Sequence, residues 1–527
     1  MSKKKLGIIL IIIVIIALVF GIIYNINSNA TTTITTSNTI KLNNKSVTIT
    51  KGGTYNITGT LKNGDITINT DSDVKLILNN VTINNKSSCI NVIKAKNVYI
   101  ETKGTNSLTS TALTSEQNGT IYSKSDLFLL GTGILNIKSN IDGIISKDDL
   151  QIDSGTYNIV SDDDGIIGRD SIVVNNGKIN ITSKGDGIKT TNEEKGNIEI
   201  NNGKFNITSS MDAIQSIKDL VINDGTFNIK TGSGSTTTSQ NNGWLNSGET
   251  DSIKGLKSSG NIYINKGSID IESEDDSIHS NSNVEIKSAT INIKSGDDGI
   301  HANNIVNIKS GTINISQSYE GIEGSQINIS GGDVSVTASD DGINVNGGND
   351  GSSMNGRPGQ NNVDSTSASK LTISGGKIRV ASSGDGLDSN GNIYINGGTV
   401  YVDGPTNDGN GALDYDGEFV IKGGTIIAVG SSGMAQNASD SSTQNTVLVN
   451  LTSSYSGKIT FGDLTYTPSK SYSSILISSS KLSTGKTYSL KIDNNEVESV
   501  TISDTITNIG NNFNGMMNRG FEGNVNR

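Results

Sequence analysis

Short segments in which apolar and polar residues alternate are separated by glycine corners along most of the chain. One copy has such segments at residues 198–200 and 205–207 on either side of Gly203, and further copies occupy residues 306–315 and 393–402. Alternation with a period of two predicts β-strands that bury one face. Glycine at the corner supplies the backbone dihedrals that a sharp turn needs. We therefore expect short strands joined by turns throughout.

A unit of the form Asp-Gly-Ile recurs together with these strands. Asp142, Asp164 and Asp186 open three consecutive units and are 22 residues apart (164 − 142 and 186 − 164). Two longer intervals contain polar inserts at residues 232–248 and 347–369, which we predict to be loops. The first acidic residues of the remaining units are Asp212, Asp251, Asp276, Asp298, Glu320, Asp341 and Asp385.

Self-similarity at this period is typical of a solenoid, because one repeat cannot bury its own apolar face but stacked repeats can. The sequence predicts an all-β fold, a right-handed parallel β-helix of about thirteen coils with about 4.8 Å between coils. We expect the helix over residues 31–445, with the two inserts as loops. A small β cap over residues 446–507 would cover the open end. Residues 508–527 are rich in Asn and Gly and predict a disordered tail.

Residues 1–30 form a separate segment. Three lysines at residues 3–5 precede an apolar, uncharged run at residues 6–23. At about 1.5 Å per residue this run is just long enough to cross a bilayer as a helix, and the lysines predict a cytoplasmic N-terminus. The alternative is a cleaved signal peptide with Ser28 and Ala30 before the cut. We therefore expect the rest of the chain on the extracellular face of the membrane, or secreted if the signal is cleaved.

Composition narrows the classes of function. Hydrophobic residues make up 32% of the 527 residues, below the roughly 45–50% of an ordinary globular domain, so a thin, elongated core is expected. The formal net charge of −11 disfavours a nucleic-acid partner. The single cysteine excludes an intrachain disulfide framework and any cysteine-rich zinc or iron–sulfur site.

Acidic residues at the same place in consecutive coils must stack. At about 4.8 Å and an effective dielectric near 20, two carboxylates repel by roughly 3.5 kcal/mol, so the stack needs counter-charge. Calcium fits, because oxygen ligands at about 2.3–2.6 Å allow one ion to bridge adjacent coils. The alternative is that each aspartate bonds its own local backbone in a turn. The predicted calcium ligands are Asp163, Asp164, Asp275, Asp276, Asp297, Asp298, Glu320, Glu323, Asp340, Asp341 and Asp385.

The position after each core Ile or Leu is expected to point outward beside the acids. Such a polar strip would hold an extended anionic polysaccharide, with metal bridging the carboxylates of the ligand and lysines pairing with them. An ordinary solvated face is the alternative. Tyr263 and Tyr394 lie in predicted strands and would stack on sugar rings. The other predicted substrate-binding residues are Lys189, Lys254, His279, His301, Asn344 and Asp388.

The stretches SGDDGIHANN (295–304) and SGDGLDSNGNIYINGGTV (383–400), together with residues 318–348, resemble a family of bacterial cell-surface carbohydrate-binding proteins. The resemblance covers roughly residues 80–510. It implies a calcium-binding right-handed parallel β-helix, similar to the helix of polysaccharide lyases. It also implies binding of acidic plant-wall polysaccharide (polygalacturonate) and of cellulose.

Two classes of function follow, a non-catalytic glycan-binding module and a calcium-dependent polysaccharide lyase. A lyase needs calcium to acidify the proton beside a uronate carboxylate, and it needs a base to remove that proton. The candidate bases are Lys189, Lys254, Arg169 and Arg379, and none lies inside the acidic stretch 275–341. We therefore favour the binding module. A surface spacer or adhesin that binds no sugar is a third alternative.

Overall fold

The computed structural model describes residues 37–116, 118–235, 252–345 and 369–510. All regular elements among these residues are β-strands. None of the described residues belongs to a helix long and apolar enough to cross a membrane. The apolar run that we interpret as an anchor or signal lies outside the described residues, as do most of both inserts and of the expected tail.

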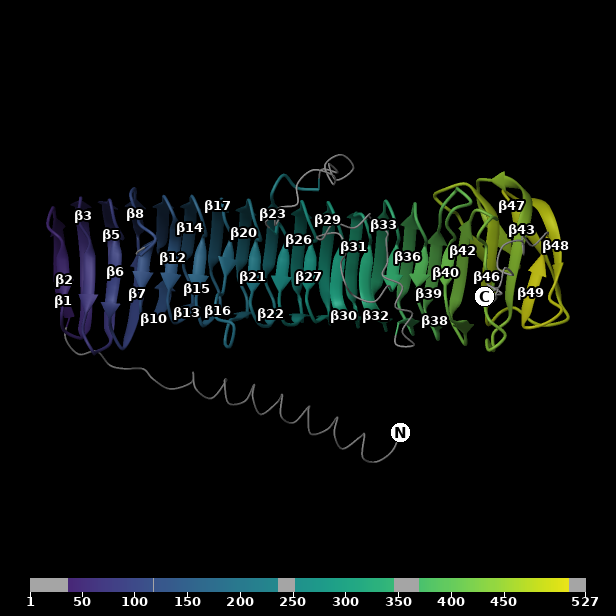
Figure 1. Cartoon of the computed structure of the whole chain (residues 1–527), viewed down its shortest axis with the longest axis horizontal. Helices are drawn as coiled ribbons and strands as arrows, with labels where there is room; N and C mark the ends of the chain where they lie inside the picture. Colours follow the sequence, from purple (N-terminus) through teal and green to yellow (C-terminus); the bar gives the residue numbers. More distant parts are fainter. Residues whose placement is uncertain (1–36, 117, 236–251, 346–368, 511–527) are drawn as a thin grey trace, which may run out of the picture.

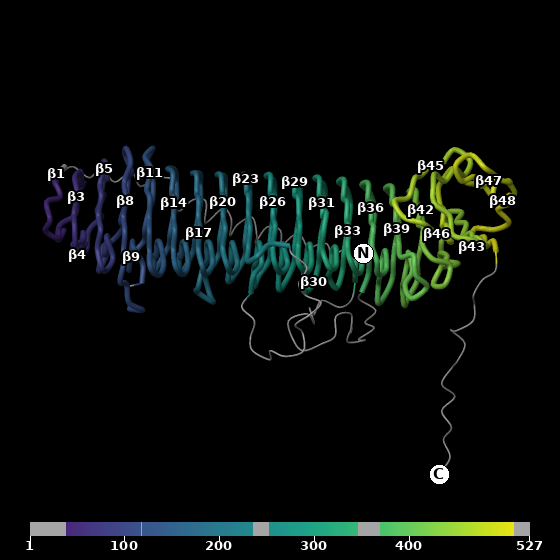
Figure 2. Tube along the Cα trace, turned by 90° about the horizontal axis from the view of Figure 1, so that it is seen from above, coloured from purple at the N-terminus to yellow at the C-terminus, as the bar shows by residue number. Residues whose placement is uncertain are grey.

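The strands form a parallel β-solenoid of about 16 turns. Figure 1 shows an elongated rod, and Figure 2 shows its coils following one another at regular intervals from the N-terminal to the C-terminal end. At about 4.8 Å per turn, the rod is about 75 Å long. Each turn contributes strands to three parallel ladders.

The first ladder follows the acidic corners. Its strands are β2 (Val47–Ile49), β4 (Ile66–Asn69), β6 (Ile90–Lys94), β9 (Gly119–Ser123), β12 (Asp142–Ser146), β15 (Ile166–Gly168), β18 (Ile188–Lys189), β21 (Ile214–Ser216), β24 (Leu256–Ser258), β27 (Ile278–Ser280), β30 (Ile300–Ile308), β32 (Ile322–Ile329), β34 (Ile343–Val345), β37 (Leu387–Ser389) and β40 (Leu413–Tyr415).

The second ladder comes next in each turn, and β30 and β32 continue into it. Its other strands are β1 (Ser37–Asn43), β3 (Gly53–Lys62), β5 (Val74–Asn85), β7 (Asn97–Lys103), β10 (Asp126–Gly131), β13 (Asp149–Ile152), β16 (Ser171–Val174), β19 (Asn197–Ile200), β22 (Leu220–Ile222), β25 (Ile262–Ile264), β28 (Asn283–Ile286), β35 (Lys370–Ile373), β38 (Asn392–Ile395) and β41 (Phe419–Ile421).

The third ladder completes each turn, and β3 and β5 continue into it. Its other strands are β8 (Thr105–Ser110), β11 (Ile134–Ser139), β14 (Thr156–Ser161), β17 (Lys178–Ser183), β20 (Lys204–Ser209), β23 (Thr226–Thr231), β26 (Gly267–Ser273), β29 (Ala289–Ser295), β31 (Gly311–Gln317), β33 (Asp333–Ala338), β36 (Lys377–Ser382), β39 (Thr399–Asp403) and β42 (Thr425–Gly430).

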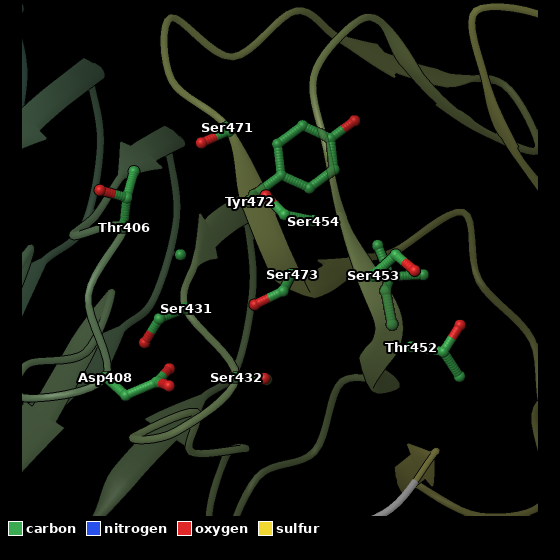
Figure 3. A pocket seen from close by; sticks show the side chains of 12 residues that line it. Thr406, Asp408, Ser431, Ser432, Thr452, Ser453, Ser454, Ser471, Tyr472 and Ser473 are labelled. Atoms are coloured by element: carbon green, nitrogen blue, oxygen red, sulfur yellow. The ribbon is translucent and has the colours of Figure 1, made fainter.

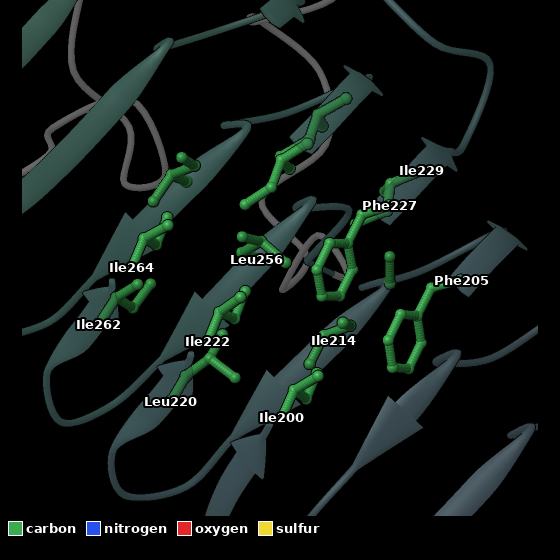
Figure 4. Packing of buried hydrophobic residues seen from close by; sticks show 14 of the residues in the cluster. Ile200, Phe205, Ile214, Leu220, Ile222, Phe227, Ile229, Leu256, Ile262 and Ile264 are labelled. Carbon is green, nitrogen blue, oxygen red and sulfur yellow. The ribbon is translucent and has the colours of Figure 1, made fainter. Parts of the chain in front are cut away.

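The core is built by pairing like positions from turn to turn. Ile144 pairs with Ile166, which pairs with Ile188, and all three are buried. Phe205 and Phe227 stack with ring centroids 4.6 Å apart. Figure 4 shows these two rings beside aliphatic side chains of the neighbouring ladders in the interior. Because identical side chains stack along the axis, a modest apolar fraction fills a long, narrow core.

The solenoid has about 16 turns, more than the thirteen that we predict for the same part of the chain, and its first turns lack the acidic unit. β1, β3 and β5 pair side by side as long strands. Positive φ angles at Gly59 (96°) and Asn80 (54°) accompany these strands. Only the later turns carry the Asp-Gly-Ile signal that the sequence reveals.

The solenoid ends where strand direction reverses. β46 (Tyr472–Ser479) pairs antiparallel with both β42 and β43 (Thr446–Tyr455), and β43 pairs with β49 (Ile506–Ile509). A separate antiparallel sheet contains β44 (Ile459–Phe461), β45 (Leu464–Tyr466), β47 (Thr487–Ile492) and β48 (Asn495–Thr501). These strands share their own apolar cluster with the end of the solenoid. β49 continues two residues into the segment 508–527 that we expected to be disordered.

Candidate functional site

The corner residues of successive turns stack into one line, which we call the acid column. The first ladder pairs the residue two positions after each corner, from Ile144 to Leu413. The backbone repeats with the same regularity, as in the bond from the Gly143 N–H to the Asp164 carbonyl oxygen (2.9 Å). The acid column comprises Asp142, Asp164, Asp186, Asp212, Lys254, Asp276, Asp298, Glu320, Asp341 and Asp385.

One oxygen of most column carboxylates accepts a backbone N–H of the next turn. The Asp164 N–H donates to Oδ1 of Asp142 (2.9 Å), and the Asp298 N–H donates to Oδ1 of Asp276 (3.0 Å). The same bond joins the pairs Asp186–Asp164, Asp212–Asp186, Lys254–Asp212 and Asp385–Asp341.

This bond was not predicted from the sequence, which suggested either metal ligands or turn aspartates bonded to their own backbone. The constant spacing of the acids along the sequence could have indicated this bond between turns, because a bond within a single turn requires no constant spacing. The second oxygen of each carboxylate remains for another partner.

Lys254 occupies the place in the acid column that we assigned to Asp251 from the sequence. Leu256 pairs with Ile214 on one side and Ile278 on the other, so the corner unit of this turn is Lys254-Gly255-Leu256. Asp251 lies outside the described residues. Lys254 therefore lies in the acid column itself and not in the outward strip where it was expected.

Lys254 neutralises two of its neighbours. Its Nζ donates to Oδ1 of Asp275 (2.8 Å) and to Oδ2 of Asp276 (2.6 Å), and the residue is only 8% exposed. Burial disfavours the charged amine, but the carboxylates of Asp276 and Asp275 outweigh burial and raise the pKa of Lys254. This lysine is a built-in cation.

A second line of side chains, the flanking column, lies beside the acid column. Its members directly follow the paired core residues of the first ladder, and they are Ile145, Ile167, Lys189, Gln215, Lys257, His279, His301, Glu323, Asn344 and Asp388. We expected this strip to point into solvent. Instead, every member from His279 to Asp388 is at most 9% exposed. The expected open polysaccharide seat is therefore largely closed along this line.

Lysines of the flanking column pair with the N-terminal part of the acid column. Lys189 Nζ lies 2.5 Å from Oδ2 of Asp164 and 3.2 Å from Oδ2 of Asp186. Lys257 Nζ lies 3.1 Å from Oδ2 of Asp212. Each of these acids thus has both a backbone donor and an ammonium partner.

The two histidines of the chain stack on each other, with ring centroids 4.7 Å apart and planes 6° from parallel. Nδ1 of His279 lies 2.7 Å from Oδ2 of Asp276, and Nδ1 of His301 lies 2.6 Å from Oε2 of Glu323 and 3.3 Å from Oδ2 of Asp298. Burial pushes the pKa of Asp276 up, but Lys254 and His279 hold it well below its usual value. The histidines are therefore held inside the acidic network.

Beyond His301, the two columns are acidic without a lysine or arginine partner among the described residues. Glu320 accepts the Asn344 amide (2.7 Å). Burial, followed by repulsion from neighbouring acids, raises the pKa of Asp298 and Glu320 well above their usual values. The same causes raise the pKa of Asp341 to about 7 and that of Asp388 to about 8.

Two further predicted ligands lie at this end, Asp385 in the acid column and Asp340 beside it. Burial raises the pKa of Asp385 to about 6. Asp340 precedes Asp341 at the corner and approaches the Tyr319 hydroxyl, whose pKa is raised by burial and by this carboxylate. This end of the columns therefore concentrates negative charge.

Three groups that each include predicted calcium ligands converge closely enough to hold an ion, since their ligand atoms lie within 4.8 Å of one another. They are Asp142, Asp163 and Asp164; Asp275, Asp276 and Asp297; and Asp298, His301 and Glu323. Asp142 and His301 were not among the predicted calcium ligands. Lys189 pairs with the first group and Lys254 with the second. The third group contains a ring nitrogen beside two carboxylates and no ammonium group within the described residues.

The two predicted stacking tyrosines lie on one face but not close together. Tyr263 and Tyr394 both occupy outward, half-buried positions of the second ladder. Five steps of ladder pairing separate them, through Glu285, Asn307, Asn328 and Thr372. At about 4.8 Å per step they are about 24 Å apart, so they do not form one aromatic platform.

Comparisons with known proteins point to carbohydrate binding. A family model described as "Carbohydrate-binding domain-containing protein" matches residues 43–299. No curated protein matches the chain. Among solved structures, a polysaccharide lyase-like protein from C. thermocellum, a gadolinium derivative, is 28% identical over 37% of this chain and 91% of that chain, with a TM-score of 0.36.

Proposed function

Because residues 43–299 match the model of a carbohydrate-binding domain family and fold as a β-helix, we propose that this chain binds polysaccharide without cleaving it. The proposed ligand is an acidic, plant-wall type of chain such as polygalacturonate. The proposed cofactor is calcium, bound along the columns between Asp298 and Asp388. The proposed location is the cell surface, with an N-terminal anchor or a cleaved signal in residues 1–30.

The observation that carries the calcium proposal is the unbalanced charge of this stretch. Asp298, Glu320, Asp341 and Asp388 are buried or half-buried, and no lysine or arginine of the described chain pairs with them. An uncompensated buried charge is costly, and a divalent cation removes that cost. The donors are mainly carboxylate oxygens, which suit a hard cation that takes six to eight oxygen ligands.

An anionic polysaccharide is supported by the same charge balance. A calcium ion at the half-buried Asp340, Asp341 and Asp385 would keep coordination positions toward solvent, where uronate carboxylates would complete its shell. The net charge of the chain is −11, which would repel such a ligand in the absence of bound cations. Binding is therefore expected to require calcium.

The lyase alternative lacks a suitable base. Lys189 and Lys254 are each paired with two carboxylates, which raise their pKa values despite burial. Arg379 pairs with Asp333 (2.8 Å) on the outer face of the third ladder, away from the first ladder that carries the flanking column. Arg169 follows β15 at the opposite end of the first-ladder strand from the acid column. None of these four groups is a free base beside the unpaired acids.

The test is calorimetric titration of the purified chain with polygalacturonate in calcium and in chelator. We expect affinity to fall by about tenfold or more in chelator, which is about 1.4 kcal/mol. The double variant Asp341→Asn/Asp385→Asn should lose the calcium effect. The matched control Asp164→Asn/Asp186→Asn changes the same column where Lys189 already supplies the charge, and it should keep the effect.

Equal affinity in calcium and chelator would contradict the calcium proposal. An equal loss in both double variants would contradict its location. Release of unsaturated, ultraviolet-absorbing product in the same mixtures would instead support the lyase.

A further inference from the structure

A pocket lies where the solenoid meets its cap. Its volume is about 250 Å³. It is formed by the segment between β39 and β40, the residues after β42, the outer part of β43 and the start of β46. Figure 3 shows Thr406, Asp408 and Ser431 on one side and Thr452 and Ser453 on the other, with Ser473 between them.

An irregularity in strand pairing creates one wall of this pocket. Asn450 pairs with Ser474, and Tyr455 pairs with Tyr472, so residues 451–454 face a single residue of β46. The extra residues leave the ladder and carry their hydroxyls to the pocket. Bulges of this kind commonly re-aim side chains beside functional sites.

The lining is rich in hydroxyl groups that are not used by the fold. Within the described chain, the side chains of Ser432, Ser453, Ser454, Ser471 and Ser473 make no hydrogen bond. A serine hydroxyl both donates and accepts, so it complements the hydroxyls of a sugar in either direction. These groups are exposed or half-buried and are available to a ligand.

The negative charge in the pocket favours a neutral sugar over an acidic one. Asp408 is the one charged residue among the described residues that line the pocket. Its Oδ1 accepts the Gly433 N–H (3.1 Å), and no bond engages its Oδ2. A free carboxylate oxygen accepts hydrogen bonds from sugar hydroxyls but repels a uronate. The volume is below the roughly 300–1,000 Å³ of pockets that enclose drug-sized ligands, which restricts the ligand to a small unit.

We propose that this pocket binds a neutral, polyhydroxylated sugar unit, without calcium, at the end of the rod. Its lining shares no residue with the acid column, and it takes a different class of ligand. A free sugar and the end of a neutral polysaccharide share this chemistry, so both are tested. The inference goes beyond the proposed function, since it adds a second, metal-independent saccharide site.

The experiment is calorimetric titration of the full chain, in chelator, with glucose and with a neutral β-linked glucose hexasaccharide. We expect at least one of them to bind. A free sugar as ligand predicts equal affinity for both, whereas a chain end predicts tighter binding of the hexasaccharide. Asp408→Ala should weaken binding about tenfold, and Ser453→Trp should abolish it because an indole ring at this exposed position fills the pocket.

Two controls separate this inference from the proposed function. Asp440→Ala removes an exposed acid near the same end of the rod and should leave affinity unchanged. Asp341→Asn/Asp385→Asn should also leave neutral-sugar binding unchanged, although it abolishes the calcium effect on polygalacturonate.

Three results would overturn the inference. The first is that neither sugar binds. The second is that both pocket variants bind as tightly as Asp440→Ala. The third is that calcium alone binds and Asp408→Ala removes that binding, since the pocket would then be a cation site.

Discussion

The two halves of the acid column occupy the same corner of the solenoid but balance their charge differently. From Asp164 to Asp276, lysines pair with the carboxylates, and Lys254 even replaces an acid within the column. From Asp298 to Asp385, no ammonium or guanidinium group of the described chain does so. The comparison teaches that the chain itself balances a stack of like charges in one half, whereas the other half is where we propose an external cation.

The largest expected effect comes from removing the internal cation. Lys254→Met leaves Asp275 and Asp276 buried without their shared partner, and breaking a buried pair typically costs about 3–5 kcal/mol. Because solenoids open locally, we expect faster amide hydrogen exchange in turns 254–300. Unchanged protection there would show that the histidines alone suffice to balance these acids.

Exchanging charged partners between the two halves should transfer the calcium requirement that we propose. Asp388 lies three residues after Asp385 and one turn from Asp341, as Lys189 lies relative to Asp186 and Asp164. Asp388→Lys should therefore raise stability in chelator by about 2 kcal/mol, since one pair at 4 Å and a dielectric near 20 gives roughly 4 kcal/mol before desolvation.

The reciprocal variant, Lys189→Asp, should make the N-terminal half depend on calcium. Thermal unfolding with and without calcium checks both variants. If calcium stabilises each variant as it does the unmodified chain, the two halves do not differ in the way we infer.

In chelator, the free energy of unfolding should also decrease as pH rises, because the buried acids of the C-terminal half lose their protons. Burial and neighbouring acids raise the pKa of Asp388 to about 8, above the unfolded value of about 3.9. The folded state therefore holds a proton that the unfolded state has lost, and stability decreases as pH rises from about 4 to about 8. We expect a loss of about 1–2 kcal/mol between pH 5 and pH 8 in urea unfolding, smaller in Asp388→Asn. A flat profile would contradict the charge imbalance.

The smallest effect is expected at an exposed pair. Lys266 Nζ lies 2.8 Å from Oδ2 of Asp224, the same distance as Lys254 from Asp275, but the Lys266 side chain is 69% exposed. Lys266→Met should leave stability almost unchanged, because water screens an exposed pair. A cost comparable to that of Lys254→Met would show that burial does not distinguish the two lysines.

The stacking of the acids could be predicted from the sequence, because the constant spacing of Asp142, Asp164 and Asp186 fixes their register. The place of Lys254 was missed, because the polar insert before it hides the spacing and Asp251-Ser252-Ile253 imitates the repeat. The number of residues between the core Leu or Ile of the corner unit and the next strand identifies the unit more reliably. Leu256 precedes Ile262 by six residues, as Leu387 precedes Ile393, whereas Ile253 precedes it by nine.

The burial of the flanking column could not be read from alternation alone. The period of two places His301 and Glu323 on the outer side of the strand, yet both are nearly inaccessible. Their polar atoms turn toward the acids of the same and the adjacent turn, and that attraction depends on three-dimensional neighbours that periodicity does not reveal. The pocket beside the cap was also missed, because it joins four segments that no motif connects.

The antiparallel strand β46 ends the stacking of parallel coils at the C-terminal end of the rod. A parallel edge left at β42 would be a template for one more coil, whether from this chain or from another copy. Because β46 runs the opposite way and is itself flanked by β43, the stacking rule stops there. This end of the molecule therefore has a fixed length and does not offer an edge for end-to-end assembly into a fibre.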